Sequence, residues 1–147
     1  MYAAVIPPKV ACFNSLNVIR GPKDDRSRHY VVAVLNSFVY EYLIRKQSKN
    51  NNVNIYFVSL TPLPILRATD PRFGRIASMS ADLHRLNSQT NGAPGDLEAK
   101  LEAAVAHVYG LTDDEFEFIL EGFHRVPEQY RQLVLQIFRE KEGWLAA

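Results

Sequence analysis

Residues 29–47 read HYVVAVLNSFVYEYLIRKQ and decide the expected fold, because apolar side chains recur along them at helical spacing. The apolar stripe consists of Tyr30, Val31, Val34, Leu35, Phe38, Tyr42 and Leu43. Ser37, Glu41 and Arg45 form a narrow polar line, in which Glu41 is placed to pair with Arg45 one turn later. A helix that is apolar around most of its circumference packs against more than one layer. We therefore predict a buried central helix over residues 29–47.

Short apolar runs on both sides of that helix predict a small β-layer, because β-branched and aromatic runs bounded by Pro, Asn or Gly are typical of strands. The runs before the helix are residues 2–6, 10–13 and 18–19, and they are followed by a charged loop, Arg20–Arg28. After the helix, residues 53–60 read VNIYFVSL and are the clearest strand. Pro62 and Pro64 would stop this strand from continuing in a central ladder.

The rest of the chain is expected to be helical. Asp70 and Pro71 suit the start of one helix, Gly110 the end of the next, and Pro127 the start of the last. The inward-facing residues of the first two are Ile76, Met79, Leu83 and Leu86, then Leu97, Leu101, Val105 and Val108. Between Gly110 and Pro127, a capping box of Thr112 and Glu115 opens a short helix. The predicted fold class is thus α+β: a strand-containing part, residues 1–66, followed by a mostly helical part, residues 67–147, packed as one compact unit.

Composition and charge exclude several classes of protein. The chain has 147 residues, of which 47% are hydrophobic and 22% charged, as in an ordinary globular domain. No apolar run is long enough to span a bilayer and no signal peptide is expected, so we predict a protein without membrane contact. The single cysteine, Cys12, fits the reducing cytoplasm. The net charge of +1 is low for a free-standing DNA-binding domain, but the basic residues gather between Arg20 and Lys49.

The sequence carries no recognisable catalytic constellation. The seven glycines are scattered, so no Gly-rich loop could cradle a nucleotide or a methyl donor, and no Asn-Pro-Pro or Gly-x-Ser-x-Gly sequence occurs. The four histidines, at 29, 84, 107 and 124, lack the spacing of metal ligands. We therefore expect no catalytic, cofactor-binding or metal-binding residue in this chain.

The binding candidates lie at the end of the predicted central helix. Polar and basic residues gather there: Arg45, Lys46, Gln47, Lys49 and Asn54. Amide side chains can read adenine edges, and arginine can read guanine or hold phosphate. The structural alternative is equally well founded, because cations are favourable at a helix C-terminus and Asn suits tight turns. Asn14 and Ser15 form a second candidate DNA contact, for which a simple turn is the alternative.

The order of the segments adds a resemblance. The chain runs VIPPKVACFNSLNVI, VVAVLNSFVYEYLIRKQS, NVNIYFVSLTPLPI and, later, LEAAVAHVYGLTDDEFEFILEGF. This order resembles the C-terminal region of large restriction–modification adenine methyltransferases, including single-chain enzymes that also cleave DNA. The matching elements are Asn14-Ser15, Leu35-Asn36-Ser37, Arg45, Asn54, Leu63-Pro64 and residues 106–112. Two features depart from the family pattern. Lys46 stands where the family often has Gln. In the Leu-Pro-x-Pro element of the family, here the Pro element, the second proline is out of place, because Pro62 and Pro64 both precede Ile65.

The resemblance implies that this chain chooses the DNA sequence and is itself non-catalytic. A separate N-terminal catalytic domain of the parent enzyme would hold S-adenosylmethionine, flip an adenine out of double-stranded DNA and methylate its exocyclic amine, as part of a prokaryotic-type defence. On its own, the fragment would cover its docking surface by forming a dimer. The alternative is a free-standing helical protein-interaction module without DNA binding, which the near-neutral charge favours.

Overall fold

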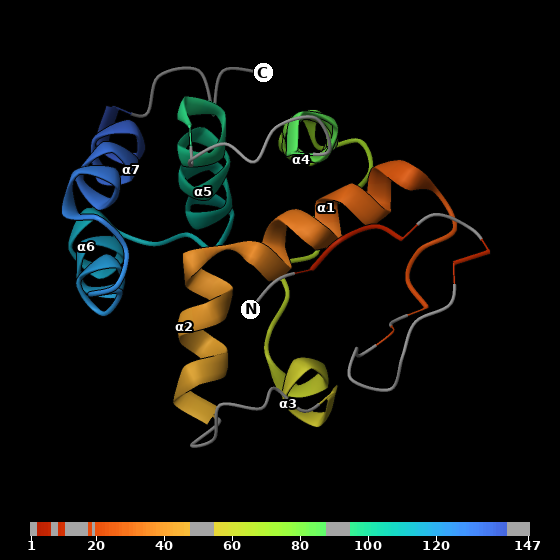
Figure 1. The fold of residues 1–147 in the computed structure, drawn as a ribbon, viewed down its shortest axis with the longest axis horizontal. Coiled ribbons are helices and arrows are strands. Elements are labelled where there is room, and N and C mark those ends of the chain that lie inside the picture. Colours follow the sequence, from red (N-terminus) through yellow and green to blue (C-terminus); the bar gives the residue numbers. More distant parts are fainter. Residues whose placement is uncertain are drawn as a thin grey trace.

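The computed structural model describes residues 3–6, 9–10, 18, 20–47, 55–87 and 95–140, and these form seven helices (Figure 1). They are α1 (Asp25–Asn36), α2 (Phe38–Gln47), α3 (Ile55–Leu60), α4 (Pro71–Asn87), α5 (Asp96–Val108), α6 (Asp113–Glu121) and α7 (Glu128–Glu140). No strand occurs in the described ranges, so the predicted α+β fold with a small β-layer is wrong, and this part of the chain is all-helical.

The predicted strand at 53–60 is instead the short helix α3, in so far as it lies in the described residues. Periodicity cannot separate a short apolar strand from a short helix, and no described strand offers a pairing partner. The described part of the first run, residues 3–6, is not a strand either. Asn36 meets its backbone, because its side-chain oxygen accepts from the Ala3 N–H at 2.6 Å and its amide donates to the Ala3 carbonyl at 2.9 Å. The other two predicted strands lie mostly outside the described residues.

The predicted central helix is two helices that meet at Ser37. Ser37 has extended backbone angles, φ −72° and ψ 152°, and its N–H bonds to the Val34 carbonyl. Its hydroxyl donates to the Val34 carbonyl at 2.7 Å and accepts from the Tyr40 N–H at 3.2 Å. Serine therefore closes α1 and opens α2 at once, as its tendency to bond locally to the backbone allows. The charged loop is also shorter than predicted, because Asp24 caps α1 by accepting from the Ser27 N–H at 2.8 Å.

Several predicted helix boundaries are confirmed. The Asp70 carboxylate accepts from the Arg72 N–H at 2.9 Å at the start of α4. Gly110 has the positive φ of 74° that favours glycine after a helix. Thr112 and Glu115 form the reciprocal capping box of α6, with the Thr112 N–H 2.8 Å from the glutamate oxygen.

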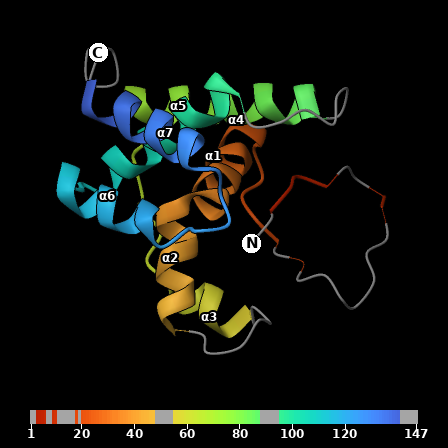
Figure 2. The same cartoon turned by 60° about the vertical axis from the view of Figure 1, so that its left-hand side comes forward.

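Two hydrophobic cores hold the helices together. The first core is built from α1, α2, α4 and α5: Tyr30, Ala33, Val34, Leu35, Tyr40, Ile44, Phe73, Ile76, Ala77, Leu101, Ala104 and Val105. The second core joins α2, α5, α6 and α7: Phe38, Val39, Ala99, Ala103, Ala106, Phe116, Ile119, Leu120, Phe123, Val134, Leu135 and Phe138. Helix α5 supplies both cores from opposite sides, and each core draws residues from both sides of residue 66. In two views α2 and α3 lie together at the end of the molecule away from α4 (Figures 1 and 2).

Candidate nucleic-acid interface

The C-terminal end of α2 carries three of the predicted DNA-contacting residues, Arg45, Lys46 and Gln47, and all three are exposed. Consecutive residues on an α-helix point about 100° apart. The three side chains accordingly have different neighbours. The structure thus brings the residues to one helix end but spreads them around it.

Arg45 is held by contacts within the molecule. Its guanidinium forms an ion pair with Glu41, as the sequence predicts, and lies 4.6 Å from the centre of the Phe123 ring. The Arg45 side chain is 56% exposed, so one side of it still faces solvent. Because Glu41 offsets its charge, Arg45 is suited to fastening α2 onto Phe123 of the second core.

Lys46 lies in an aromatic setting. Its amino group is 5.1 Å from the centre of the Tyr42 ring, a cation–π contact that does not cancel the lysine charge. Tyr42 also contacts Phe118 of α6, with ring centres 6.4 Å apart. Phe118 is 62% exposed, which is unusual for a phenylalanine. A cation near an exposed ring such as Phe118 can hold a phosphate while the ring stacks on a base.

Gln47 points to the segment that follows α3. Its amide donates to the Thr61 hydroxyl at 3.2 Å, and that hydroxyl donates to the Phe57 carbonyl at 2.8 Å. Gln47 therefore connects the end of α2 to the end of α3. The remaining predicted contacts, Asn14, Ser15, Lys49 and Asn54, lie outside the described residues.

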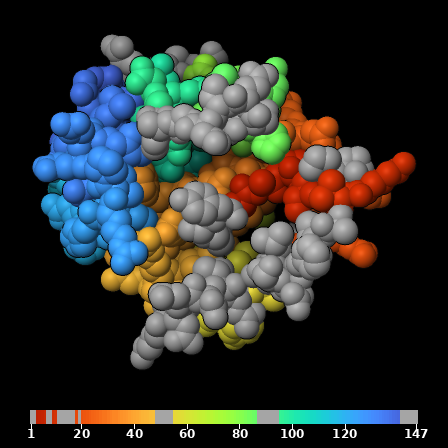
Figure 3. Space-filling model, in the orientation of Figure 1, coloured from red at the N-terminus to blue at the C-terminus, as the bar shows by residue number. Residues whose placement is uncertain are grey.

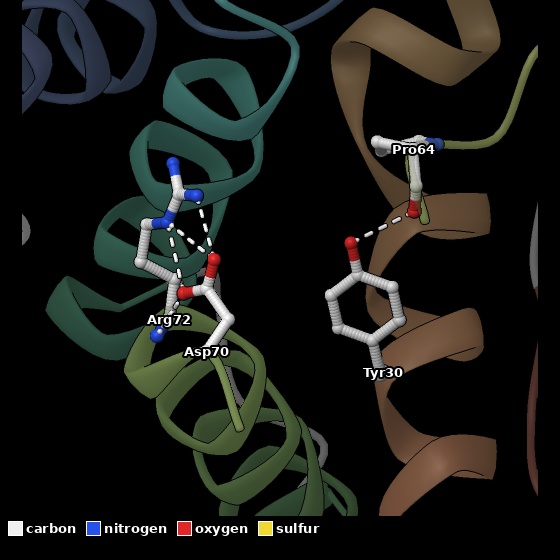
Figure 4. A network of polar contacts seen from close by, with 4 residues as sticks. All are labelled: Tyr30, Pro64, Asp70 and Arg72. Carbon is white, nitrogen blue, oxygen red and sulfur yellow. Dashed lines mark hydrogen bonds and ion pairs between the residues drawn. The ribbon is translucent and has the colours of Figure 1, made fainter. Parts of the chain in front are cut away.

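Three tyrosine hydroxyls hold the chain from α3 to the Pro element; we refer to them as the tyrosine clamp. Tyr40 of α2 donates to the Val58 carbonyl at 3.1 Å, Tyr109 after α5 to the Pro62 carbonyl at 3.0 Å, and Tyr30 of α1 to the Pro64 carbonyl at 2.9 Å. Figure 4 shows the Tyr30 hydroxyl directed at Pro64. Burial raises the pKa of Tyr30 to about 12 and also raises that of Tyr40, so these hydroxyls stay protonated as donors.

Ion pairing fixes the chain where α4 follows the Pro element. The Arg72 guanidinium contacts both oxygens of Asp70, the closer at 2.6 Å (Figure 4). Hydrogen bonding from Arg72 holds the pKa of Asp70 below its ordinary value. The segment is therefore anchored at both ends.

The clamped segment turns some side chains inward and others outward: Thr61 is buried and Val58 and Leu63 pack on the first core, whereas other apolar side chains are exposed. No residue of α3 is buried, and Ile55, Tyr56 and Leu60 are exposed. Ile65, between the last clamped carbonyl and α4, is 91% exposed. In the space-filling view, α2 lies beside α6 on one face, and only parts of α3 are visible below it (Figure 3). The Gln47–Thr61 contact therefore brings the segment that carries these exposed apolar residues to the basic end of α2.

Sequence reasoning missed two parts of this surface. Phe118 lies outside the Phe116, Ile119 and Leu120 stripe of α6, and such an out-of-register aromatic residue is a signal that could have been read. The tyrosine clamp left no local signal, because its partners are backbone carbonyls 18 to 47 residues away.

No group of three or more His, Cys, Asp or Glu side chains in the described ranges could hold a metal ion. Among the helices of the same ranges, none has the length and apolar character needed to cross a membrane.

Comparisons with known proteins give no relative of this chain. No protein-family model matches it, and neither the curated proteins nor the solved structures contain a match.

Proposed function

We propose that this chain is the target-recognition part of a restriction–modification adenine-N6 DNA methyltransferase and that it contacts double-stranded DNA without carrying out the chemistry. The observation that carries the proposal is the ordered series of elements that resembles that family, from Asn14-Ser15 to the junction at residues 106–112. The methyl donor, S-adenosylmethionine, would bind in a separate catalytic domain of the parent enzyme.

The surface around the end of α2 supports this proposal. Lys46 lies beside Tyr42, whose ring in turn contacts the exposed Phe118, and this combination of a cation and aromatic rings is suited to phosphate and base contact. Arg45 is offset by Glu41, so it contributes less to DNA affinity than its sequence position indicates. We expect Lys46 to be the main phosphate contact of the α2 end.

DNA binding by the parent enzyme tests the proposal. Affinity for duplex DNA is measured by fluorescence anisotropy over a salt series, for the wild type and for Lys46→Ala. Losing one phosphate contact should weaken binding to all sequences alike and reduce the salt slope by roughly one unit. Lys100→Ala, which removes an exposed cation of α5 instead, is the matched control and should leave the slope unchanged. An unchanged slope for Lys46→Ala would exclude the proposed contact.

Two further measurements separate recognition from catalysis. The proposal expects a reading frame for an Asn-Pro-Pro methyltransferase domain fused to, or beside, the one for this chain. It also expects that calorimetry on the 147-residue chain detects no micromolar binding of S-adenosylmethionine. Micromolar binding of the methyl donor would contradict the assignment.

A protein-interaction module is the second candidate function, and the exposed apolar residues of the clamped segment favour it. Ile65 at 91% and Tyr56 at 61% exposure are large side chains that a partner protein could cover. Under this alternative, Ile65→Ser would abolish binding of the partner and leave the DNA salt series unaffected. If the chain is encoded together with a catalytic domain but the joined protein has no affinity for DNA, this candidate is favoured over the first.

A further inference from the structure

A buried carboxyl group lies at the bend between α1 and α2. Glu102 of α5 is only 9% exposed, and one of its carboxylate oxygens accepts from the Phe38 N–H at 2.9 Å. Phe38 is the first residue of α2, whose opening N–H groups have no partner within the helix. Glu102 thus caps a helix that is 64 residues away in the sequence.

The bend is held by two side chains with different consequences. The Ser37 hydroxyl, which accepts from the Tyr40 N–H, is local and would cap α2 in whatever direction the helix ran. Glu102 belongs to α5, which is fixed in both cores. The hydrogen bond from Phe38 to Glu102 therefore ties the start of α2 to the centre of the molecule.

The surroundings of Glu102 favour its protonated form. The titratable groups that act on it or face it are Glu41 from α2, Glu98 from α5 and Tyr130 from α7. Burial raises the pKa of Glu102 to about 8. The nearby Glu98 and Glu41 carboxylates also raise this pKa, whereas the hydrogen bond from the Phe38 N–H lowers it. The buried hydroxyl of Tyr130 has no hydrogen-bond partner among the described residues, so it offers a nearby polar group without a charge.

We infer that Glu102 is a positioning residue that sets the direction of α2 and makes that direction sensitive to pH. In the neutral form, the carboxyl accepts from Phe38 without the cost of a buried charge. Ionisation places a buried charge between the helices, close to Glu41 of α2, so the packing of α2 on α5 at the bend is weakened although the bond from the Phe38 N–H itself favours the charge.

The far end of α2 amplifies such a change. A helix of ten residues is about 15 Å long, so a tilt of about 10° at Phe38 would move the other end by about 2.5 Å and loosen the contacts of Arg45 with Phe123 and of Gln47 with Thr61. That end carries Lys46, the cation assigned above to DNA. The importance of the tilt for DNA rests on the proposed function, whereas the tilt itself does not.

The test uses the full chain and two structural readouts that need no DNA. The first follows the Phe38 amide resonance by NMR from about pH 5 to about pH 9.5. The second measures, by pulsed electron resonance, the distance between spin labels at positions 46 and 100, two exposed lysines on α2 and α5, in a Cys12→Ser background. The variants are Glu102→Gln, Glu102→Ala and, as a matched control on the same helix, Glu98→Gln.

In the wild type, the Phe38 resonance should titrate with a midpoint near 8, and the label distances should broaden above it. Glu102→Gln keeps an oxygen acceptor but cannot ionise, so its resonance and distances should be constant with pH. Glu98→Gln should keep the titration with a lower midpoint, because it removes one repelling carboxylate. Glu102→Ala should broaden the distances at every pH.

Three results would overturn the inference: a wild-type Phe38 resonance that does not titrate, a titration retained in Glu102→Gln, or wild-type distances in folded Glu102→Ala. If Glu102→Ala does not fold, the pH series of the wild type and Glu102→Gln decides. A chain that shows the predicted titration but whose parent protein binds no DNA would refute the proposed function and leave this inference standing.

Discussion

Thr112 is the residue whose contribution can be stated most directly. Its hydroxyl accepts from the Glu115 N–H at 3.3 Å and is the N-cap half of the capping box of α6. Replacing an N-cap threonine by alanine costs about 0.5–2 kcal/mol. Thr112→Ala should therefore lower the free energy of unfolding by that amount in urea denaturation. Thr69→Ala, at an exposed turn residue, is the control, and an equal loss in both variants would contradict the capping role.

Gly74 allows Arg26 of α1 to lie against α4. A methyl group at Gly74 would overlap the Arg26 guanidinium, which also lies 5.3 Å from the centre of the Phe73 ring. Alanine is more favourable than glycine inside a helix by about 1 kcal/mol. Gly74→Ala should therefore stabilise the protein by about that amount in an Arg26→Ala background and by clearly less in the wild type. A double-mutant cycle in urea measures the difference, and equal effects in both backgrounds would show that the two residues are independent.

His29 makes stability depend on pH on the acid side. Burial lowers the pKa of His29, and the nearby His84 lowers it further against an opposing effect of Asp25. A histidine whose pKa is lower in the folded than in the unfolded state stabilises the fold fully above the unfolded-state pKa, near 6.5. This stabilisation is lost as the pH falls through the folded-state pKa. The melting temperature of His29→Gln should therefore fall less between about pH 7 and about pH 5 than that of the wild type. The exposed His124 provides the control, since His124→Gln should keep the wild-type slope.

At the scale of elements, α3 depends on the tyrosine clamp. The Val58 carbonyl would normally accept from the N–H four residues later, but Pro62 has none, so the Tyr40 hydroxyl takes its place. Tyr40→Phe removes one hydrogen bond worth about 0.5–1.5 kcal/mol and leaves a carbonyl unpaired. Hydrogen exchange should accelerate in α3 more than in α4.

Tyr42→Phe is the matched control for that experiment. Tyr42 lies on the same helix as Tyr40, but its ring faces Phe118 of α6 instead of α3. Exchange in α3 should therefore stay at the wild-type rate in Tyr42→Phe. Equal acceleration in both variants would indicate a general loosening of α2.

The sequence predicts the C-terminal helices well because their ends carry local signals. Asp70, Gly110 and Thr112 act on backbone groups within a few residues, so the code for each boundary is short. The prediction for the N-terminal half was wrong because the contacts that decide its structure are not local. The bend at Ser37 is completed by Glu102, and the short apolar run of α3 is held at Val58 by Tyr40 of another helix, so neither is visible in a local window.

The candidate site was predicted only in part for the same reason. A basic helix end was visible in the sequence, and so was the pairing of Glu41 with Arg45. The contact of Tyr42 with Phe118, next to Lys46 on Tyr42, was not visible, because Phe118 comes from another helix.

At the scale of the whole molecule, α5 makes the two cores one cooperative unit. It presents Leu101, Ala104 and Val105 to the first core and Ala99, Ala103 and Ala106 to the second. Ile76→Ala in the first core and Leu120→Ala in the second should each lower stability by about 2–5 kcal/mol. Both variants should still unfold in a single transition.

Calorimetry and near-ultraviolet circular dichroism can check this cooperativity. In a two-state protein the calorimetric and van't Hoff enthalpies agree, and the two probes give the same midpoint. If Leu120→Ala melted in two steps, the cores would be independent and α5 would not couple them.

The tyrosine clamp separates the shape of the segment between α3 and α4 from its sequence. All three hydroxyls grip backbone carbonyls, which every amino acid possesses, while side chains such as Leu60 and Ile65 remain outside. Substitution at these exposed positions leaves the hydrogen bonds intact. Selection can therefore change the binding specificity of the surface without changing the fold. A protein that must acquire new targets over evolutionary time would benefit from a fixed backbone whose exposed side chains can change.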